Sequence, residues 1–224
     1  RPNIMYDNLL WNAFEAENLE DLKKIFSIEK VRNCGTYEGS YYPRYDDLIR
    51  KYIDVRDWEK VRKMLSFDGI LHKSAIVDSK SNLVYQGPSS VVYYAHFNML
   101  QKLIFENPPF DIAEKFIRLA GEDGIVNSYS SAFGSLFHLC LENDYDDDIL
   151  KLLVEIGGKG MLLQREEDSG CSVLHSMIRS GCETDLIEMA VEKGGTDLLS
   201  LRNSSCGETA LHLACSEGVD TATI

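Results

Sequence analysis

The sequence predicts an all-α solenoid of stacked helix-turn-helix repeats that are joined by short hairpins or loops. The first observation is that His138, His175 and His212 stand 37 residues apart, each directly after an apolar residue. The second is that a glycine stands twenty residues after two of these histidines, at Gly158 and Gly195. The third is that apolar residues recur at helical spacing. A fixed period of this length is typical of proteins in which each unit stacks on its neighbours.

Each repeat is predicted to begin with a short inner helix. A small hydroxyl residue stands three positions before each histidine, at Ser135, Ser172 and Thr209. Such a side chain accepts a hydrogen bond from an unpaired N–H in the first turn of a helix, so it favours an N-cap there. The turns expected at the end of the inner helices are at Asp144, Gly181 and Gly218.

A longer outer helix is predicted to follow each turn. Its apolar stripe is clearest at Ile149, Leu153 and Ile156, which share one helical face. The Gly157–Gly158 pair is expected to end this helix with a left-handed C-cap. Neither helix can bury its stripe alone, so neighbouring repeats must stack.

Fainter copies precede the three histidine blocks. Gln101 stands where the next histidine would fall and Gly121 keeps the glycine position, so residues 96–127 are predicted to form a fourth block. Residues 9–27 and 48–66 align with each other at a shift of 39 residues. Each of these two segments is predicted to form two short amphipathic helices.

These motifs resemble those of a known family. The segment TALHLAC at residues 209–215 resembles the T-P-L-H-x-A-A signature of ankyrin repeats, and SVLHSM and SLFHLC resemble degenerate copies of it. The positions of the signature's proline hold Ala210, Val173 and Leu136. The period of 37 residues also exceeds the usual length of about 33. The surplus falls after the Gly-Gly pair, where Met161, Leu162 and Leu163 are predicted to add a helical turn.

The resemblance implies a division of the chain. Residues 1–75 are expected to be degenerate ankyrin-like helical pairs, residues 76–95 an inserted loop, and residues 96–224 ankyrin repeats. The inserted loop accounts for fifteen residues by which the period lengthens there. The last repeat is truncated, because its closing glycine would fall beyond Ile224. We therefore expect a frayed end and a native chain that continues through at least the rest of this repeat.

The resemblance also implies a function, that of a non-catalytic scaffold for protein–protein interaction that uses the concave face and the hairpin tips. The implied partner contacts are Glu142, Asn143, Asp168, Ser169, Cys171, Arg179, Ser180, Ser205, Cys206, Glu208, Ser216 and Glu217. The histidines and their hydroxyl partners are expected to be structural, each histidine bonding within the turn between hairpin and inner helix. An alternative stays open, in which the chain is the interaction arm of a larger enzyme or membrane protein whose functional domain lies outside it.

Charge and composition limit the partners. The net charge of −13 lies entirely in residues 76–224, so the chain should repel phosphate backbones and favour a protein with a basic surface. We expect no nucleic-acid partner. No stretch approaches the length of apolar sequence, about 18 residues, that a membrane span needs. The six cysteines are irregularly spaced, which favours reduced thiols in an intracellular, cytoplasmic protein.

The sequence carries no clear catalytic or metal-binding motif. His138 and Cys140 lie close together, but no Cys/His spacing matches the paired ligands of a zinc site. Cys171 and Cys206, predicted to be exposed near the hairpin tips, have no associated acid or base motif. The acids at 142–148 suit the start of an outer helix, while those at 166–170 are predicted to serve recognition. We predict no catalytic residue, metal or cofactor, and an enzyme built on the Cys/His pairs stays an open alternative.

Overall fold

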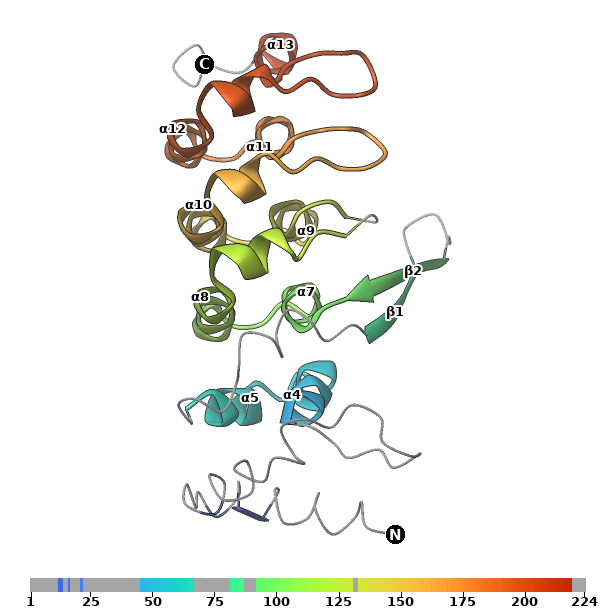
Figure 1. The fold of residues 1–224 in the computed structure, drawn as a ribbon, viewed down its shortest axis with the longest axis vertical. Coiled ribbons are helices and arrows are strands. Elements are labelled where there is room, and N and C mark those ends of the chain that lie inside the picture. Colours follow the sequence, from blue (N-terminus) through green and yellow to red (C-terminus); the bar gives the residue numbers. More distant parts are fainter. Residues whose placement is uncertain are drawn as a thin grey trace. The chain divides into compact units, whose positions relative to one another are not determined.

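The computed structural model describes residues 12, 13, 16, 21, 45–66, 81–86, 92–130 and 133–218. The chain divides into two compact units, Arg1–Ala75 and Ile76–Ile224, and each is described here by itself. Figure 1 shows the helices and strands of both.

The first unit contains the helix pair α4 (Tyr45–Asp54) and α5 (Trp58–Leu65). The turn between them passes through Arg56 at a φ of 54°, and the Asp57 side chain accepts a hydrogen bond from the Lys60 backbone N–H at 3.3 Å. Ile53 and Met64 are fully buried. The two helices predicted over 48–66 are thus confirmed, whereas those predicted over 9–27 lie almost wholly outside the described residues.

The described part of the second unit is a stack of helix pairs. Its inner helices are α7 (Met99–Phe105), α9 (Leu136–Glu142), α11 (Val173–Ser180) and α13 (Ala210–Glu217). Its outer helices are α8 (Phe110–Val126), α10 (Asp147–Leu162) and α12 (Thr184–Ser200). Each inner helix packs on the next inner helix and each outer helix on the next outer helix, which gives the two columns of Figure 1. The predicted all-α solenoid of stacked helix-turn-helix repeats is confirmed.

The turns between inner and outer helices recur with the predicted period. Asn107, Asp144, Gly181 and Gly218 stand 37 residues apart, and all four have a positive φ, between 51° and 68°. Glycine adopts this conformation freely, and asparagine and aspartate tolerate it better than other side chains do. The three predicted turns are confirmed, and Asn107 provides a fourth in the block that lacks the histidine.

The outer helices do not end at their glycines in the way the sequence predicts. Gly121, Gly158 and Gly195 combine a φ of 53° to 64° with a ψ near −156° or −175°, so they are not left-handed C-caps. Only glycine adopts this region readily, and here it turns the chain into one further helical turn. Met161 and Leu162 lie in that turn and are fully buried, which confirms the predicted extra turn.

The segment expected as an inserted loop is a β-hairpin, so that expectation is wrong. Strands β1 (Ser81–Gln86) and β2 (Val92–Phe97) pair antiparallel, with Ser81 opposite Phe97 and Gln86 opposite Val92. Strand β2 leads directly into Asn98, the N-cap of α7. Later repeats have a shorter hairpin at this place, reduced to single bridges between Arg165 and Ser172 and between Arg202 and Thr209. The insertion therefore lengthens one repeat's hairpin.

Adjacent hairpins touch at Gly170. The Ser204 backbone N–H donates to the Ser169 carbonyl at 2.9 Å, across the boundary between two repeats. A Cβ on Gly170 would lie 2.8 Å from the Ser204 backbone nitrogen, closer than van der Waals contact allows. Gly207 holds the same position one repeat later, where a Cβ would have nothing within 4 Å.

The last described repeat is open on one side. Leu211 is 51% exposed, whereas Leu174 and Phe137 at the same position of earlier repeats are 2% and 0% exposed. His212 is exposed too, while His138 and His175 are buried. The predicted frayed end falls on residues 219–224, which lie outside the described residues.

Alanine at Gly170 should destabilise the protein more than alanine at Gly207, although both occupy one repeat position. Their φ values are +63° and +71°, so each alanine carries a left-handed strain of about 1–2 kcal/mol. Only at Gly170 would Cβ meet the next hairpin, which should add about 1–3 kcal/mol. Urea unfolding followed by circular dichroism measures both changes. Equal urea midpoints for the two variants would mean that a Cβ at position 170 does not clash with the next hairpin.

Candidate protein-binding surface

The first turns of α7, α9 and α11 are held by a reciprocal contact between an N-cap residue and the residue three positions later. In α9 the Ser135 backbone N–H donates to Nδ1 of His138 at 3.2 Å, and the Ser135 Oγ lies 2.7 Å from the same nitrogen. The Ser135 Oγ also accepts from the His138 backbone N–H at 3.4 Å. Because a backbone N–H can only donate, Nδ1 is an acceptor and the neutral ring carries its proton on Nε2.

The contact between the hydroxyl and Nδ1 recurs along the stack, at the residues for which a structural role is predicted. Oγ of Ser172 lies 2.8 Å from Nδ1 of His175, and Oγ1 of Thr209 lies 2.7 Å from Nδ1 of His212. In α7 a different pair makes the reciprocal contact. The Asn98 side chain accepts from the Gln101 backbone N–H at 2.8 Å, and the Gln101 side chain accepts from the Asn98 backbone N–H at 2.9 Å. Gln101 therefore replaces the histidine in full.

The residue three positions after the N-cap also carries a second polar atom, Nε2, which faces the next repeat. Nε2 of His175 donates to the Glu208 carbonyl at 3.0 Å, and Nε2 of Gln101 donates to the Ser128 carbonyl at 3.0 Å. Nε2 of His138 has no hydrogen-bond partner although the residue is 1% exposed, and it lies 3.9 Å from Oε1 of Glu166. Burial lowers the pKa of both histidines, with the Glu166 charge acting in the opposite direction at His138.

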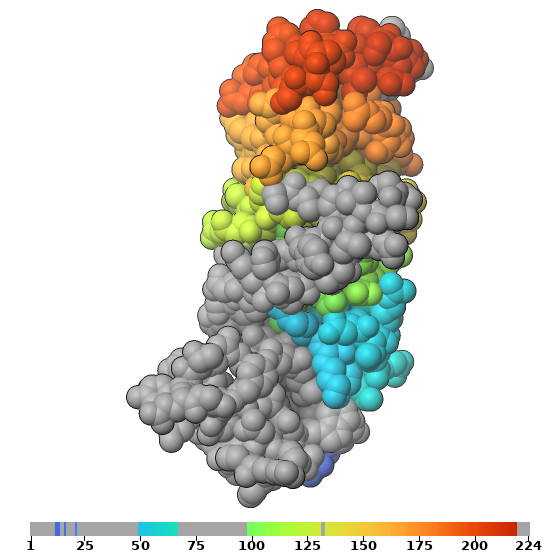
Figure 2. Space-filling view, turned by 90° about the vertical axis from the view of Figure 1, so that its right-hand side faces the viewer, coloured from blue at the N-terminus to red at the C-terminus, as the bar shows by residue number. Residues whose placement is uncertain are grey.

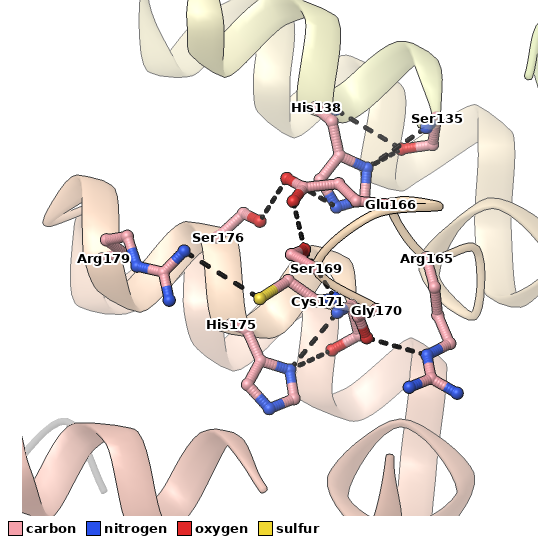
Figure 3. Close-up of polar contacts among 11 residues, drawn as sticks. Ser135, His138, Arg165, Glu166, Ser169, Gly170, Cys171, His175, Ser176 and Arg179 are labelled. Atoms are coloured by element: carbon pink, nitrogen blue, oxygen red, sulfur yellow. Dashed lines mark hydrogen bonds and ion pairs between the residues drawn. The ribbon is translucent and has the colours of Figure 1, made fainter. Parts of the chain in front are cut away.

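Glu166 is at the centre of a polar cluster between two repeats, and the sequence did not single it out. Its carboxylate accepts hydrogen bonds from the Ser169 hydroxyl of its own hairpin and from the Ser176 hydroxyl of α11, the second at 3.3 Å. Figure 3 shows this carboxylate between the His138 ring and the two serines. Glu166 was grouped with the acids at a hairpin tip, but it also organises contacts within the stack.

Two arginines brace the hairpins, and sequence reasoning missed them as well. Arg165 donates through Nε to the Gly170 carbonyl at 2.8 Å, and Arg202 donates through Nη1 to the Gly207 carbonyl at 2.6 Å. Arg165 also donates to the Arg202 carbonyl in the next repeat. Their spacing of 37 residues was a usable signal.

Most residues predicted to contact a partner lie at the surface. Those that are exposed are Glu142, Asp168, Arg179, Ser180, Ser205, Cys206, Ser216 and Glu217, and those that are partly exposed are Asn143, Ser169 and Glu208. Cys171 is 2% exposed, so its predicted exposure is wrong. It is buried because its backbone pairs with Glu166 across the hairpin and Arg179 lies over its sulfur at 3.9 Å.

Some of these residues already have contacts within the chain. Asn143 donates to the Leu139 carbonyl at 2.8 Å, and the Ser169 hydroxyl is bonded to Glu166. Cys206 donates through its thiol to Glu208 at 2.9 Å. The remaining exposed residues come from the hairpins and from the ends of inner helices. Figure 2 looks onto the side where the hairpins of Figure 1 project, and the later ones form the orange and red surface there.

Several acids on this side form no ion pair within the described part of the chain. Among the described residues, Glu142, Glu167, Asp168 and Glu217 make no ion pair. Lysines that pair with acids of the next repeat lie on the outer helices, as Lys151 does with Asp185 at 2.7 Å. The two hairpin arginines keep their positive charge, and their printed hydrogen bonds are to backbone carbonyls and not to these acids. Partial burial and the nearby Glu166 charge raise the pKa of Glu142 to about 7.

The described residues contain no metal-binding cluster and no membrane-spanning helix. In this part of the chain no three His, Cys, Asp or Glu side chains gather closely enough to hold a metal ion. None of the described helices is long and apolar enough to cross a membrane. Burial raises the pKa of the Cys140 thiol, and the Cys206 thiol contacts Asn203 and Glu208.

Glutamine at position 138 should preserve the helix start, because Gln101 makes the same contact elsewhere in the chain. We expect His138→Gln to cost less stability than His138→Ala, which removes one half of the reciprocal contact and should cost about 0.5–2 kcal/mol. The two variants are compared by urea unfolding at neutral pH. Equal losses would show that the imidazole is needed for packing and not for its hydrogen bonds.

His138→Gln should also reduce the sensitivity of the protein to acid. Because the pKa of His138 is lowered in the folded state, the unfolded chain binds the proton first, and stability falls as the pH drops below about 6.5. The variant lacks this loss, so its stability relative to the parent should rise between about pH 7 and pH 5. His212→Gln, at the exposed copy, is the matched control. A constant difference between variant and parent over this range would contradict the account.

Comparisons with known proteins bear on the fold. No protein-family model matches the sequence, and no curated protein matches it. Among solved structures, the ankyrin repeat domain of Bcl-3, described as a unique member of the IkappaB protein family, is similar with a TM-score of 0.51 and 14% sequence identity. The match covers 94% of this chain and 80% of that domain. Together with the repeat geometry, it shows that the chain has an ankyrin-like repeat fold.

Proposed function

We propose that this protein is a non-catalytic scaffold that binds another protein through its hairpin tips and the adjoining ends of its inner helices. The observation that carries the proposal is that successive repeats present exposed acids on this one side that form no ion pair within the described residues. The contact residues that we retain are Glu142, Asp168, Arg179, Ser180, Ser205, Cys206, Glu208, Ser216 and Glu217. Repeat stacking holds them on a rigid framework, which lowers the entropic cost of binding.

The partner that this surface favours has a basic face. Carboxylates that form no ion pair within the protein raise the local concentration of a positively charged partner and speed its association. The same charge disfavours nucleic acid, whose phosphates it repels. The alternative is that the chain is the interaction arm of a larger enzyme or membrane protein, in which case the same surface would bind the partner. Free thiols at the five described cysteines support a place in the reducing cytoplasm.

Reversing the charge of three hairpin-side acids should weaken partner binding. In the variant Asp168→Lys, Glu208→Lys, Glu217→Lys, we expect affinity to fall at least about tenfold, mainly through slower association. Capture of partners from a cell extract, quantified by mass spectrometry, identifies the proteins that depend on this surface. Their dissociation constants with parent and variant are then measured with purified proteins.

The matched control reverses three exposed acids of the outer helices, Glu122, Glu188 and Glu192. It produces the same change of net charge on the other column, and it should leave partner binding within about twofold of the parent. Equal weakening by both triple variants would show a general charge effect. Unchanged capture by the hairpin-side variant would remove this surface as the binding site.

A further inference from the structure

The hairpin of β1 and β2 leaves one edge of each strand without a backbone partner in the described part of the chain. The two strands form a two-stranded sheet and pair only with each other there. Successive residues of a strand direct their backbone N–H and C=O groups to opposite sides. Every second residue of the six in β2 therefore directs a donor and an acceptor away from β1. No backbone hydrogen bond joins these groups to another described residue.

The following hairpin lies beside β2 only at its base. Asn98, directly after β2, donates through its side chain to Oγ of Ser128 at 2.7 Å, at the start of that hairpin. The described residues of that hairpin form a single bridge, between Ser130 and Gly134. Strand β2 runs for six residues, which is about 20 Å. Figure 1 shows the strands projecting beyond the next hairpin, so most of the outer edge of β2 extends past it.

The later hairpins show what a neighbour of matching length does. The hairpins closed by the bridges Arg165–Ser172 and Arg202–Thr209 are equal in length. Their backbones meet, since the Ser204 N–H donates to the Ser169 carbonyl at 2.9 Å. No other described hairpin of the second unit matches the length of β1 and β2. A backbone that pairs along all of β2 must therefore come from elsewhere.

Neither strand carries the features that protect exposed edges in other proteins. Edge strands are usually guarded by charged residues, by proline or by a bulge. The two strands read SNLVYQ and VYYAHF, without lysine, arginine, aspartate, glutamate or proline. Their six pairs keep one register from end to end, so they contain no bulge. This composition favours strand formation, and the edge is suited to a further strand.

The chemistry of the edge defines its occupant. A row of backbone donors and acceptors at strand spacing is complementary to the backbone of another extended chain. Charge then separates two sources of such a chain. Residues 76–224 carry the whole net charge of −13, so two copies repel each other, whereas a segment with lysine or arginine at its ends is attracted. The occupant that fits is an extended segment of a basic partner and not a second copy.

We propose that the outer edge of β2 binds an extended segment of the partner protein, as long as β2 and flanked by lysine or arginine, which adds a third strand to the sheet. This inference rests on the proposed function and deepens it, because it names how the partner chain is held on the same side of the repeats. Backbone hydrogen bonds at the edge supply affinity, and the surrounding negative charge attracts the flanks of the segment.

The probe is a blocked eight-residue peptide of alternating threonine and valine with a lysine at each end. It is titrated into the full chain, and amide hydrogen exchange is followed by NMR with and without the peptide. The peptide should protect the amides of every second residue of β2, because the residues between them already donate to β1. The same peptide with all its core nitrogens methylated should bind at least about tenfold more weakly, since it lacks the donors. A version with glutamate ends should bind severalfold more weakly.

Tyr93→Pro and Tyr94→Pro are a matched pair of variants. Proline has no N–H, and these neighbours in β2 direct their N–H groups to opposite sides. The variant that removes the outward N–H should keep the amide protection of the hairpin itself and bind the peptide at least about threefold more weakly. The other variant should lose the protection of the hairpin, which identifies it.

The inference is overturned by equal binding of the methylated peptide, by protection on consecutive residues of β2 or on none, or by unchanged binding to both proline variants. Self-association of the chain that the peptide displaces, measured by sedimentation equilibrium, would also overturn it, because a second copy would then occupy the edge.

The same measurements separate this inference from the proposed function. Loss of partner capture in the triple hairpin-side variant, together with no peptide binding at β2, would refute the edge site and keep the proposed function. Unchanged partner capture in that variant would refute the proposed function itself.

Discussion

The stacking of the second unit is organised by one side chain per repeat at the start of its inner helix, and in two repeats this side chain bonds in two directions. In the α11 repeat this side chain is His175, which accepts from its own N-cap through Nδ1 and donates to the next repeat through Nε2. Gln101 makes both bonds with an amide. The start of a buried helix leaves several backbone N–H groups without intrahelical partners. The contact pairs one N–H group there, and in the α11 repeat it also positions the helix against the next hairpin.

The hairpins are held in place by contacts within and between repeats. Arg165 and Arg202 hold each hairpin closed, and Gly170 lets the next one approach within backbone contact. Beside these internal contacts, the exposed acids Glu142, Glu167, Asp168 and Glu217 form no ion pair within the described residues. In the proposed function their charge attracts the partner. At His138 the internal network is one bond short, because Nε2 has no hydrogen-bond partner and lies 3.9 Å from Glu166.

The periodic features of the fold could be predicted from the sequence, because each depends on a residue type with one strong local preference. Histidine after a hydroxyl residue located the inner helices, and Asp144 and Gly181 located their turns. The features that failed depend on contacts between repeats. The ψ of Gly158 follows from packing of the extra turn, the burial of Cys171 from the folded hairpin, and the role of Glu166 from two other elements. No local pattern carries that information.

The protonation of the buried histidines tests the central claim most directly, since the contact requires a neutral ring with its proton on Nε2. Nitrogen-15 NMR of the full chain at neutral pH reports the tautomer of each imidazole. The account predicts the Nε2–H tautomer for both His138 and His175. An Nδ1–H tautomer or a charged imidazolium at either residue would contradict it, because neither form can accept from the N-cap backbone.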